Sequence, residues 1–218
     1  MNLLALSFST ELIIFCSIMV GAGLLTCIVS AGYLLHDRAL RQKLFTKEKI
    51  ERYEAELAEY FSEYNILNIL QCDTMENFCK MFGATLIPSY THREDITVTK
   101  TDDGYTIAVR YDLSVRYQRY IVARELAKLI IAELREKNPN ATLTNQDKDV
   151  SRYMISYIAR ALLIPMDALV TRLRASNWES MKAVEREWLM HILCEEYKID
   201  ESKMVDRLVD HNTLIEER

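Results

Sequence analysis

The stretch YQRYIVARELAKLI (residues 117–130) decides the fold of this chain. It contains no Gly or Pro, so no residue in it interrupts a helix. Its apolar residues recur at helical spacing and form one continuous face that includes Tyr120, Ile121, Ala127 and Ile131. We therefore predict a central helix here, with the flanking segments organised around it.

The composition favours a helical protein. The chain has 218 residues, 50% of them hydrophobic, with only 5 Gly and 3 Pro, which is enough for one medium domain and an appendage. The formal net charge of −5 does not indicate a general nucleic-acid surface, so we expect no direct nucleic-acid partner. The 5 cysteines form no CxxC motif, and we interpret them as reduced thiols that serve as small apolar residues.

Residues 12–35 carry no charged side chain, and we predict that they form a single transmembrane helix. At 1.5 Å per residue this helix is about 36 Å long, enough to cross a bilayer core of about 30 Å. A buried core helix and a cleaved signal peptide are the alternatives. A core helix this long without a polar face is unusual in a small domain, and a signal peptide needs a basic segment that residues 1–11 lack.

The charges on either side of residues 12–35 predict the orientation. Glu11 is the only charged residue in segment 1–11, whereas residues 38–52 contain six Lys and Arg side chains. The positive-inside rule therefore predicts a short extracytoplasmic N-terminus, a single-pass helix in the cell membrane and a cytoplasmic C-terminal domain. Small residues at four-residue spacing, Gly23, Cys27 and Ala31, are one possible surface for homo-oligomers through the span.

Residues 36–70 are predicted to form an amphipathic stalk helix that continues from the membrane. Apolar residues recur at alternating spacings of three and four positions, with Glu and Lys between them. The stripe either packs on the chain's own domain or pairs with a second copy as a short coiled coil, and we favour packing on the domain.

Residues 71–218 are predicted to form a mostly helical α+β domain with a small three-stranded sheet. A short helix at 75–82 precedes β segments at 85–87, 96–99 and 105–111, and residues 101–104 (TDDG) indicate a hairpin between the last two. Further helices are expected at 149–164, 167–175, 180–197 and 201–210.

This order of elements resembles the ImmA/IrrE family of metallopeptidases, also described as domain of unknown function 955. The segment ISYIARALLIP (residues 155–165) is similar to the family's second helix at Ala159, Leu162, Leu163 and Pro165. The segments RYIVA (residues 119–123) and 189–208 also resemble parts of that family. The resemblance implies a zincin-like fold and an origin among prokaryotic regulators of mobile elements and prophages.

The residues that the family uses for catalysis are replaced. A zinc peptidase helix carries HExxH, in which two His bind the metal and Glu acts as general base. This chain has RELAK at residues 124–128, so the resemblance places Arg124 and Lys128 at the two His positions and leaves only Glu125. The third ligand, a carboxylate in the family, falls near Met154. We therefore expect zinc to be absent, with no intact catalytic residues and no cofactor.

The four histidines do not indicate a different metal site. His36, His92, His191 and His211 have no ligand spacing, so we interpret each as an ordinary surface or packing residue. Unpaired buried cations are costly, so we expect Glu125 to contact Lys128, three residues away, and Asp147 or Asp149 to contact Arg124 in a buried cluster. The alternative is that Arg124 and Lys128 belong to a solvated face of the helix.

Three functions compete. The leading hypothesis is a membrane-anchored, catalytically inactive pseudopeptidase that binds a cytoplasmic regulatory protein. The second is an active metallopeptidase with an atypical ligand set that uses Glu125 as base. The third is a structural membrane scaffold, a superinfection-immunity protein or a phage-defence component that uses the stalk or the span as its working surface.

Overall fold

The computed structural model describes residues 37–66, 69, 72, 74–91, 93–144 and 148–215. The chain divides into two compact units, Met1–Leu44 and Phe45–Arg218. The predicted N-terminus and transmembrane helix, residues 1–35, lie outside the described residues. Within the described part of the chain, no single helix is long and apolar enough to cross a membrane.

The predicted stalk helix is divided in two, so the expectation of one continuous helix over residues 36–70 is wrong. Residues 37–44 are helical, Phe45 and Thr46 are not, and helix α2 spans Lys47–Glu63. Thr46 has an extended backbone, while the Phe45 ring stacks on Tyr157 with centroids 5.6 Å apart. This long-range aromatic contact accompanies the break, which the local sequence does not demand.

Helix α2 buries its apolar stripe within its own unit. Ile50, Tyr53, Leu57 and Tyr60 are at most 4% exposed, and the helix contacts α8 and the short 3₁₀ helix η2. The carboxylate of Glu56 accepts hydrogen bonds from two backbone N–H groups at the start of η2, at 2.8 and 3.0 Å. The stripe that suggested a coiled coil is therefore occupied by packing on the domain.

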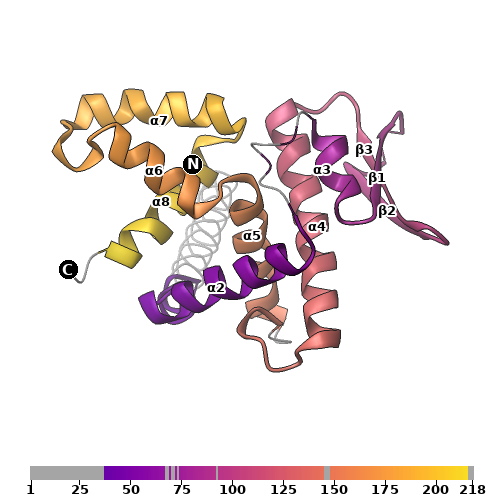
Figure 1. Cartoon of the computed structure of the whole chain (residues 1–218). Coiled ribbons are helices and arrows are strands. Elements are labelled where there is room, and N and C mark those ends of the chain that lie inside the picture. The colour runs from indigo at the N-terminus through magenta and orange to yellow at the C-terminus, as the bar shows by residue number, and fades with distance from the viewer. Residues whose placement is uncertain are drawn as a thin grey trace, which may run out of the picture. The chain divides into compact units, whose positions relative to one another are not determined.

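The central helix α4 spans Val115–Lys137 and confirms the prediction made from residues 117–130. The Ser114 hydroxyl caps it by accepting a hydrogen bond from the backbone N–H of Tyr117, at 3.3 Å. Helix α4 ends at Asn138, directly before Pro139, which cannot continue a helix. Helices α4 and α5 lie side by side with extensive contacts (Figure 1).

The sheet has three strands in the order β1-β3-β2, with β1 at Ala84–Ser89, β2 at Ile96–Thr101 and β3 at Gly104–Arg110. Strand β1 is parallel to β3, and β2 is antiparallel to β3 across the predicted hairpin. Gly104 is required at the turn, because a Cβ there would lie 2.2 Å from the carbonyl oxygen of Gly83. Helices α3 and α4 pack against this sheet, as Figure 1 shows.

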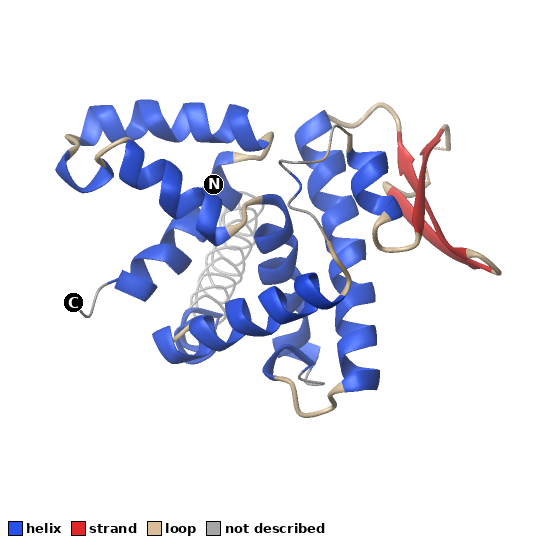
Figure 2. Ribbon diagram, viewed as in Figure 1, coloured by secondary structure: helices blue, strands red, loops and turns tan. Residues whose placement is uncertain are grey.

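The remaining helices complete the unit. Their bounds are α3 Met75–Lys80, η2 Thr142–Thr144, α5 Lys148–Leu163, α6 Met166–Ala175, η3 Trp178–Ser180, α7 Ala183–Tyr197 and α8 Glu201–Ile215. The described structure is thus mostly helical α+β with a small mixed sheet, as the sequence predicts (Figure 2). Pro165 separates α5 from α6, as expected from its fixed φ and missing N–H.

Candidate functional site

The RELAK segment of α4 has an exposed face and a buried face. Arg124 and Lys128 are exposed, while Leu126 and Ala127 between them are fully buried. The ammonium group of Lys128 donates to both carboxylate oxygens of Glu125, at 2.7 and 2.9 Å. This confirms the expected contact between Lys128 and Glu125.

The position of Arg124 contradicts the expected buried ion pair. Its side chain is exposed, and none of the carboxylates that the structure describes forms an ion pair with it. Asp147 and the side chain of Asp149, the partners we expected, lie outside the described residues. An exposed guanidinium keeps its hydration, so it needs no buried carboxylate to hold it.

The residues that the family resemblance aligns with zinc ligands do not fit zinc. Arg124 and Lys128 offer only N–H donors, and the thioether of Met154 is fully buried in α5. His191 is exposed and His211 is buried, whereas His36 and His92 lie outside the described residues. Within the ranges that the structure describes, no three His, Cys, Asp or Glu side chains are grouped to hold a metal ion.

Three tyrosines gather next to this face of α4, and we call Tyr90, Tyr111 and Tyr117 the tyrosine surface. They are 71%, 54% and 38% exposed, and the rings of Tyr90 and Tyr111 lie 5.0 Å apart. Asp95 joins the third ring to the strands. It accepts a hydrogen bond from the Tyr117 hydroxyl at 3.1 Å and pairs with Arg110, the residue before Tyr111, at 3.0 Å.

Helical spacing connects the tyrosine surface to the RELAK segment. Tyr117, Arg124 and Lys128 are seven and four residues apart, so they share one face of α4. The hydrogen bond to Asp95, together with burial, raises the pKa of the Tyr117 hydroxyl. Tyr117 and the two cations therefore lie on one face of α4, and we call them, together with Tyr90 and Tyr111, the strip of exposed aromatic and basic groups.

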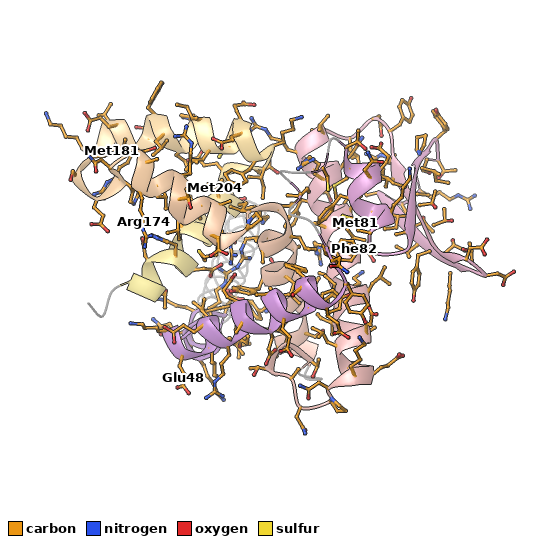
Figure 3. The ribbon with its side chains drawn as sticks, viewed as in Figure 1. Glu48, Met81, Phe82, Arg174, Met181 and Met204 are labelled. Carbon is orange, nitrogen blue, oxygen red and sulfur yellow. The ribbon has the colours of Figure 1, made fainter. Side chains whose placement is uncertain are left out.

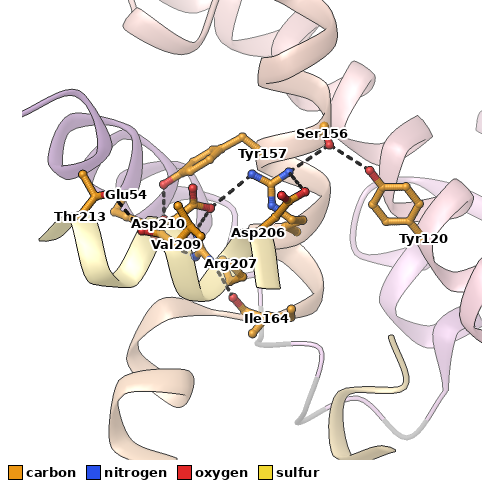
Figure 4. A network of polar contacts seen from close by, with 11 residues as sticks. Glu54, Tyr120, Ser156, Tyr157, Ile164, Asp206, Arg207, Val209, Asp210 and Thr213 are labelled. Carbon is orange, nitrogen blue, oxygen red and sulfur yellow. Dashed lines mark hydrogen bonds and ion pairs between the residues drawn. The ribbon is translucent and has the colours of Figure 1, made fainter. Parts of the chain in front are cut away.

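A second polar group is buried and centres on Arg207 of α8 (Figure 4). The Arg207 side chain is 0% exposed, and its Nε donates to the carbonyl oxygen of Ile164 at 3.0 Å. Its two terminal nitrogens hold the carboxylate of Glu54 in α2 in two-point geometry, at 2.7 and 3.2 Å. Burial lowers the pKa of Arg207, but Glu54 and its other partners raise it more, so the group stays charged.

Further members extend this network to α4. Tyr157 of α5 donates its hydroxyl to Glu54, while Arg160 pairs with Asp206 at 3.6 Å and with Asp210 at 3.3 Å. Arg160 also donates to the Ser156 hydroxyl, which hydrogen-bonds with Tyr120. Burial raises the pKa of Asp210 despite its two Arg neighbours.

Sequence reasoning missed the network, although one pattern indicates it. The buried residues of α8 include Met204, Leu208 and His211, and Arg207 lies on the same helical face. A charged residue at a core position of an amphipathic helix predicts a buried partner. The identity of that partner is not encoded locally, because Glu54 lies 153 residues away.

Helix α7 also exposes apolar side chains. Val184 and Trp188 are 76% and 67% exposed and, with Met181 at the turn after α6 (Figure 3), border a shallow hollow of about 570 Å³. Four residues separate Val184 from Trp188, so they form a short stripe on the outer face. Nothing in the described structure covers this stripe.

No protein-family model, curated protein or solved structure matches the chain. The class that the structure supports is therefore a mostly helical α+β domain with an exposed aromatic and basic strip and a buried ionic network.

Proposed function

We propose that the protein is a membrane-anchored, non-catalytic regulator of the ImmA/IrrE type, which binds a cytoplasmic protein through the strip formed by the tyrosine surface, Arg124 and Lys128. Residues 12–35 serve as the anchor. Zinc and peptidase activity have no part in this function.

One observation carries the proposal: Arg124 and Lys128 of the RELAK segment lie on the same exposed face of α4 as Tyr117. Lys128 donates to both oxygens of Glu125, so this carboxylate is engaged in an ion pair on the helix surface. Tyr and Arg side chains are enriched at the centres of protein interfaces, where they bury much area at low entropic cost. The strip thus favours binding over catalysis.

The basic charge of the strip indicates which side chains a partner should present. Arg124 has no carboxylate partner among the described residues, whereas Arg110 already pairs with Asp95 and Asp112. A suitable partner places an Asp or Glu against Arg124, where it compensates the charge. It also places an apolar segment across the tyrosines, where it covers the exposed rings. The family resemblance suggests that this partner is a regulator encoded by a prokaryote, its prophage or another mobile element, which the anchored domain sequesters.

The metal arm of the test uses the full chain in detergent, purified without chelator. Zinc measured by mass spectrometry should be far below one ion per chain, and no peptide hydrolysis should be detected. Stoichiometric zinc, or hydrolysis that Glu125→Gln abolishes, would establish the active metallopeptidase instead.

The binding arm uses in-cell cross-linking to the full chain, followed by identification of the captured protein and its purification. The affinity of that protein should fall at least tenfold for Tyr111→Ala and for Arg124→Glu. Lys100→Glu, on exposed strand β2 away from the strip, is the matched control for the charge change and should bind like the wild type. Equal binding by all variants would remove the strip as the binding surface.

A further inference from the structure

A small cavity lies between α3, the sheet and the first turns of α4. Its volume is about 240 Å³, and its described lining includes Leu86 of β1, Val109 of β3 and Val122 of α4. These three side chains provide apolar surface, while Thr74 and Gln118 add polar groups to the lining. The cavity is smaller than the sites that hold drug-sized ligands, so it suits a small group.

Arg119 is the charged residue of α4 in this lining. It lies three residues before Val122 and four after Val115, so all three share the helix face that borders the cavity. The Nε of Arg119 is buried and has no hydrogen-bond partner. None of the described carboxylates forms an ion pair with its guanidinium, and burial lowers its pKa.

Gln118, the residue before Arg119, does have acceptors for its side-chain amide. The amide of Gln118 donates to the carbonyl oxygens of Arg110, Tyr111 and Leu113, at 3.0–3.1 Å. The described residues therefore supply acceptors for the amide of Gln118 and supply none for the Nε of Arg119. A partly desolvated guanidinium without an acceptor costs free energy, which an anionic ligand would recover.

We propose that this cavity binds a carboxylate attached to a small apolar group. The carboxylate pairs with Arg119, while the apolar group fills the space between Leu86, Val109 and Val122. The exposed residues of the lining, Lys198 and Glu76, carry opposite charges and contribute little net field at the rim. Selectivity therefore rests on Arg119 for the charge and on the apolar walls for the size.

Two sources provide this chemistry: a free short-chain carboxylic acid, and the C-terminal carboxylate of a peptide that ends in a small apolar residue. Calorimetric titration of the full chain in detergent with isovalerate and with the peptide Ala-Ala-Val distinguishes them. The C-terminal amide of the same peptide lacks the charge and should bind at least tenfold more weakly. Preference for isovalerate over the peptide identifies the free acid, and the reverse identifies the peptide terminus.

Arg119→Met keeps the side-chain stem and removes the charge, so the affinity for the better ligand should fall at least tenfold. Arg135→Met is the matched control, because Arg135 belongs to the same helix and also has a buried Nε without a partner, yet does not border the cavity. Its affinity should equal that of the wild type. Equal binding by Arg119→Met, or no binding of either carboxylate at millimolar concentration, would overturn the proposal.

Val115→Trp provides a second variant that does not disturb the core. Val115 is 62% exposed, and a larger ring at this position should close the cavity while leaving Arg119 in place. Binding should be lost although urea unfolding matches the wild type. Undiminished binding to this variant would also overturn the proposal, and it decides the case if Arg119→Met does not fold. This test is independent of the strip that binds the regulatory protein.

Discussion

Arg207 is the buried charged residue at the centre of the ionic network between the helices. A wholly buried guanidinium is tolerated only when its donors are satisfied, and here Glu54 and the carbonyl of Ile164 accept from all three of its nitrogens. Because Glu54 belongs to α2 and Arg207 to α8, one ion pair fixes the first helix of the unit against its last. The specificity of this pairing, more than its net free energy, is what a buried ion pair contributes.

The Glu54→Gln variant tests this role. Loss of the carboxylate leaves the buried charge of Arg207 with only the more distant Asp210, at 3.8 Å, as an anionic partner among the described residues. The free energy of unfolding in urea should therefore fall by about 2–4 kcal/mol. Glu48→Gln is the matched control on the same helix. Glu48 is exposed and, among the described residues, forms its ion pair with exposed Arg52, so its loss should cost less than about 0.5 kcal/mol. Similar costs for both variants would show that the buried pair has no special role.

Tyr53 gives the domain a dependence on alkaline pH. Burial and the nearby charge of Glu56 raise its pKa to about 12, whereas an unfolded Tyr ionises near 10. Between these values the unfolded chain loses the proton first, so stability falls as pH rises. By about pH 11 the wild type should lose about 1 kcal/mol more than Tyr53→Phe, relative to about pH 9, in urea melts. Parallel pH profiles would contradict the raised pKa.

At the scale of elements, α4 separates two roles on its two faces. Its inner face buries Leu126 and Ala127 against the unit, while its outer face exposes Arg124 and Lys128. Local sequence predicted the helix well, because a capping Ser, uninterrupted apolar spacing and a following Pro are all readable. It did not predict that Arg124 is exposed, since the depth of each position depends on where the sheet and α5 contact the helix.

The other errors of prediction have the same origin. The break at Phe45 and Thr46 carries no Gly or Pro, and it coincides with the contact of Phe45 with Tyr157, more than a hundred residues away in sequence. Tertiary packing of this kind overrides helix propensity, which differs by less than about 1 kcal/mol between ordinary residues. The hairpin was predictable because its turn residues are adjacent in sequence, whereas the ionic network joins residues from four separate helices.

The outer face of α4 should tolerate substitution. Because Arg124 is exposed and unpaired with any described carboxylate, Arg124→Ala should change the urea unfolding free energy by less than about 0.5 kcal/mol. Leu126→Ala, two residues further along the same helix, removes a side chain that is 0% exposed and should cost about 2–5 kcal/mol. A large cost for Arg124→Ala would mean that a carboxylate outside the described residues holds it.

At the scale of the whole molecule, the chain divides at Leu44, so the folded unit begins at Phe45. The predicted span and three of the six basic residues that follow it, Arg38, Arg41 and Lys43, lie before that point. Within the folded unit, α2 is tied to α8 by the Glu54–Arg207 pair and to α5 by the contact of Tyr157 with Glu54. The first helix of the unit is thus held firmly by the domain.

The anchor itself is testable through its orientation. No Lys or Arg lies in residues 1–11. Six basic residues follow residues 12–35: Arg38, Arg41, Lys43, Lys47, Lys49 and Arg52. Basic side chains are retained on the cytoplasmic side during insertion, so a reporter fused after Arg218 should be located in the cytoplasm. Replacing the three basic residues of segment 38–43 with Gln and adding three Lys within residues 1–11 should move a substantial fraction of the reporter to the opposite side. These changes lie outside the folded unit, so urea unfolding of residues 45–218 should not respond to them. A wild-type reporter on the outer side would contradict both the charge argument and the cytoplasmic partner that the binding strip is proposed to engage.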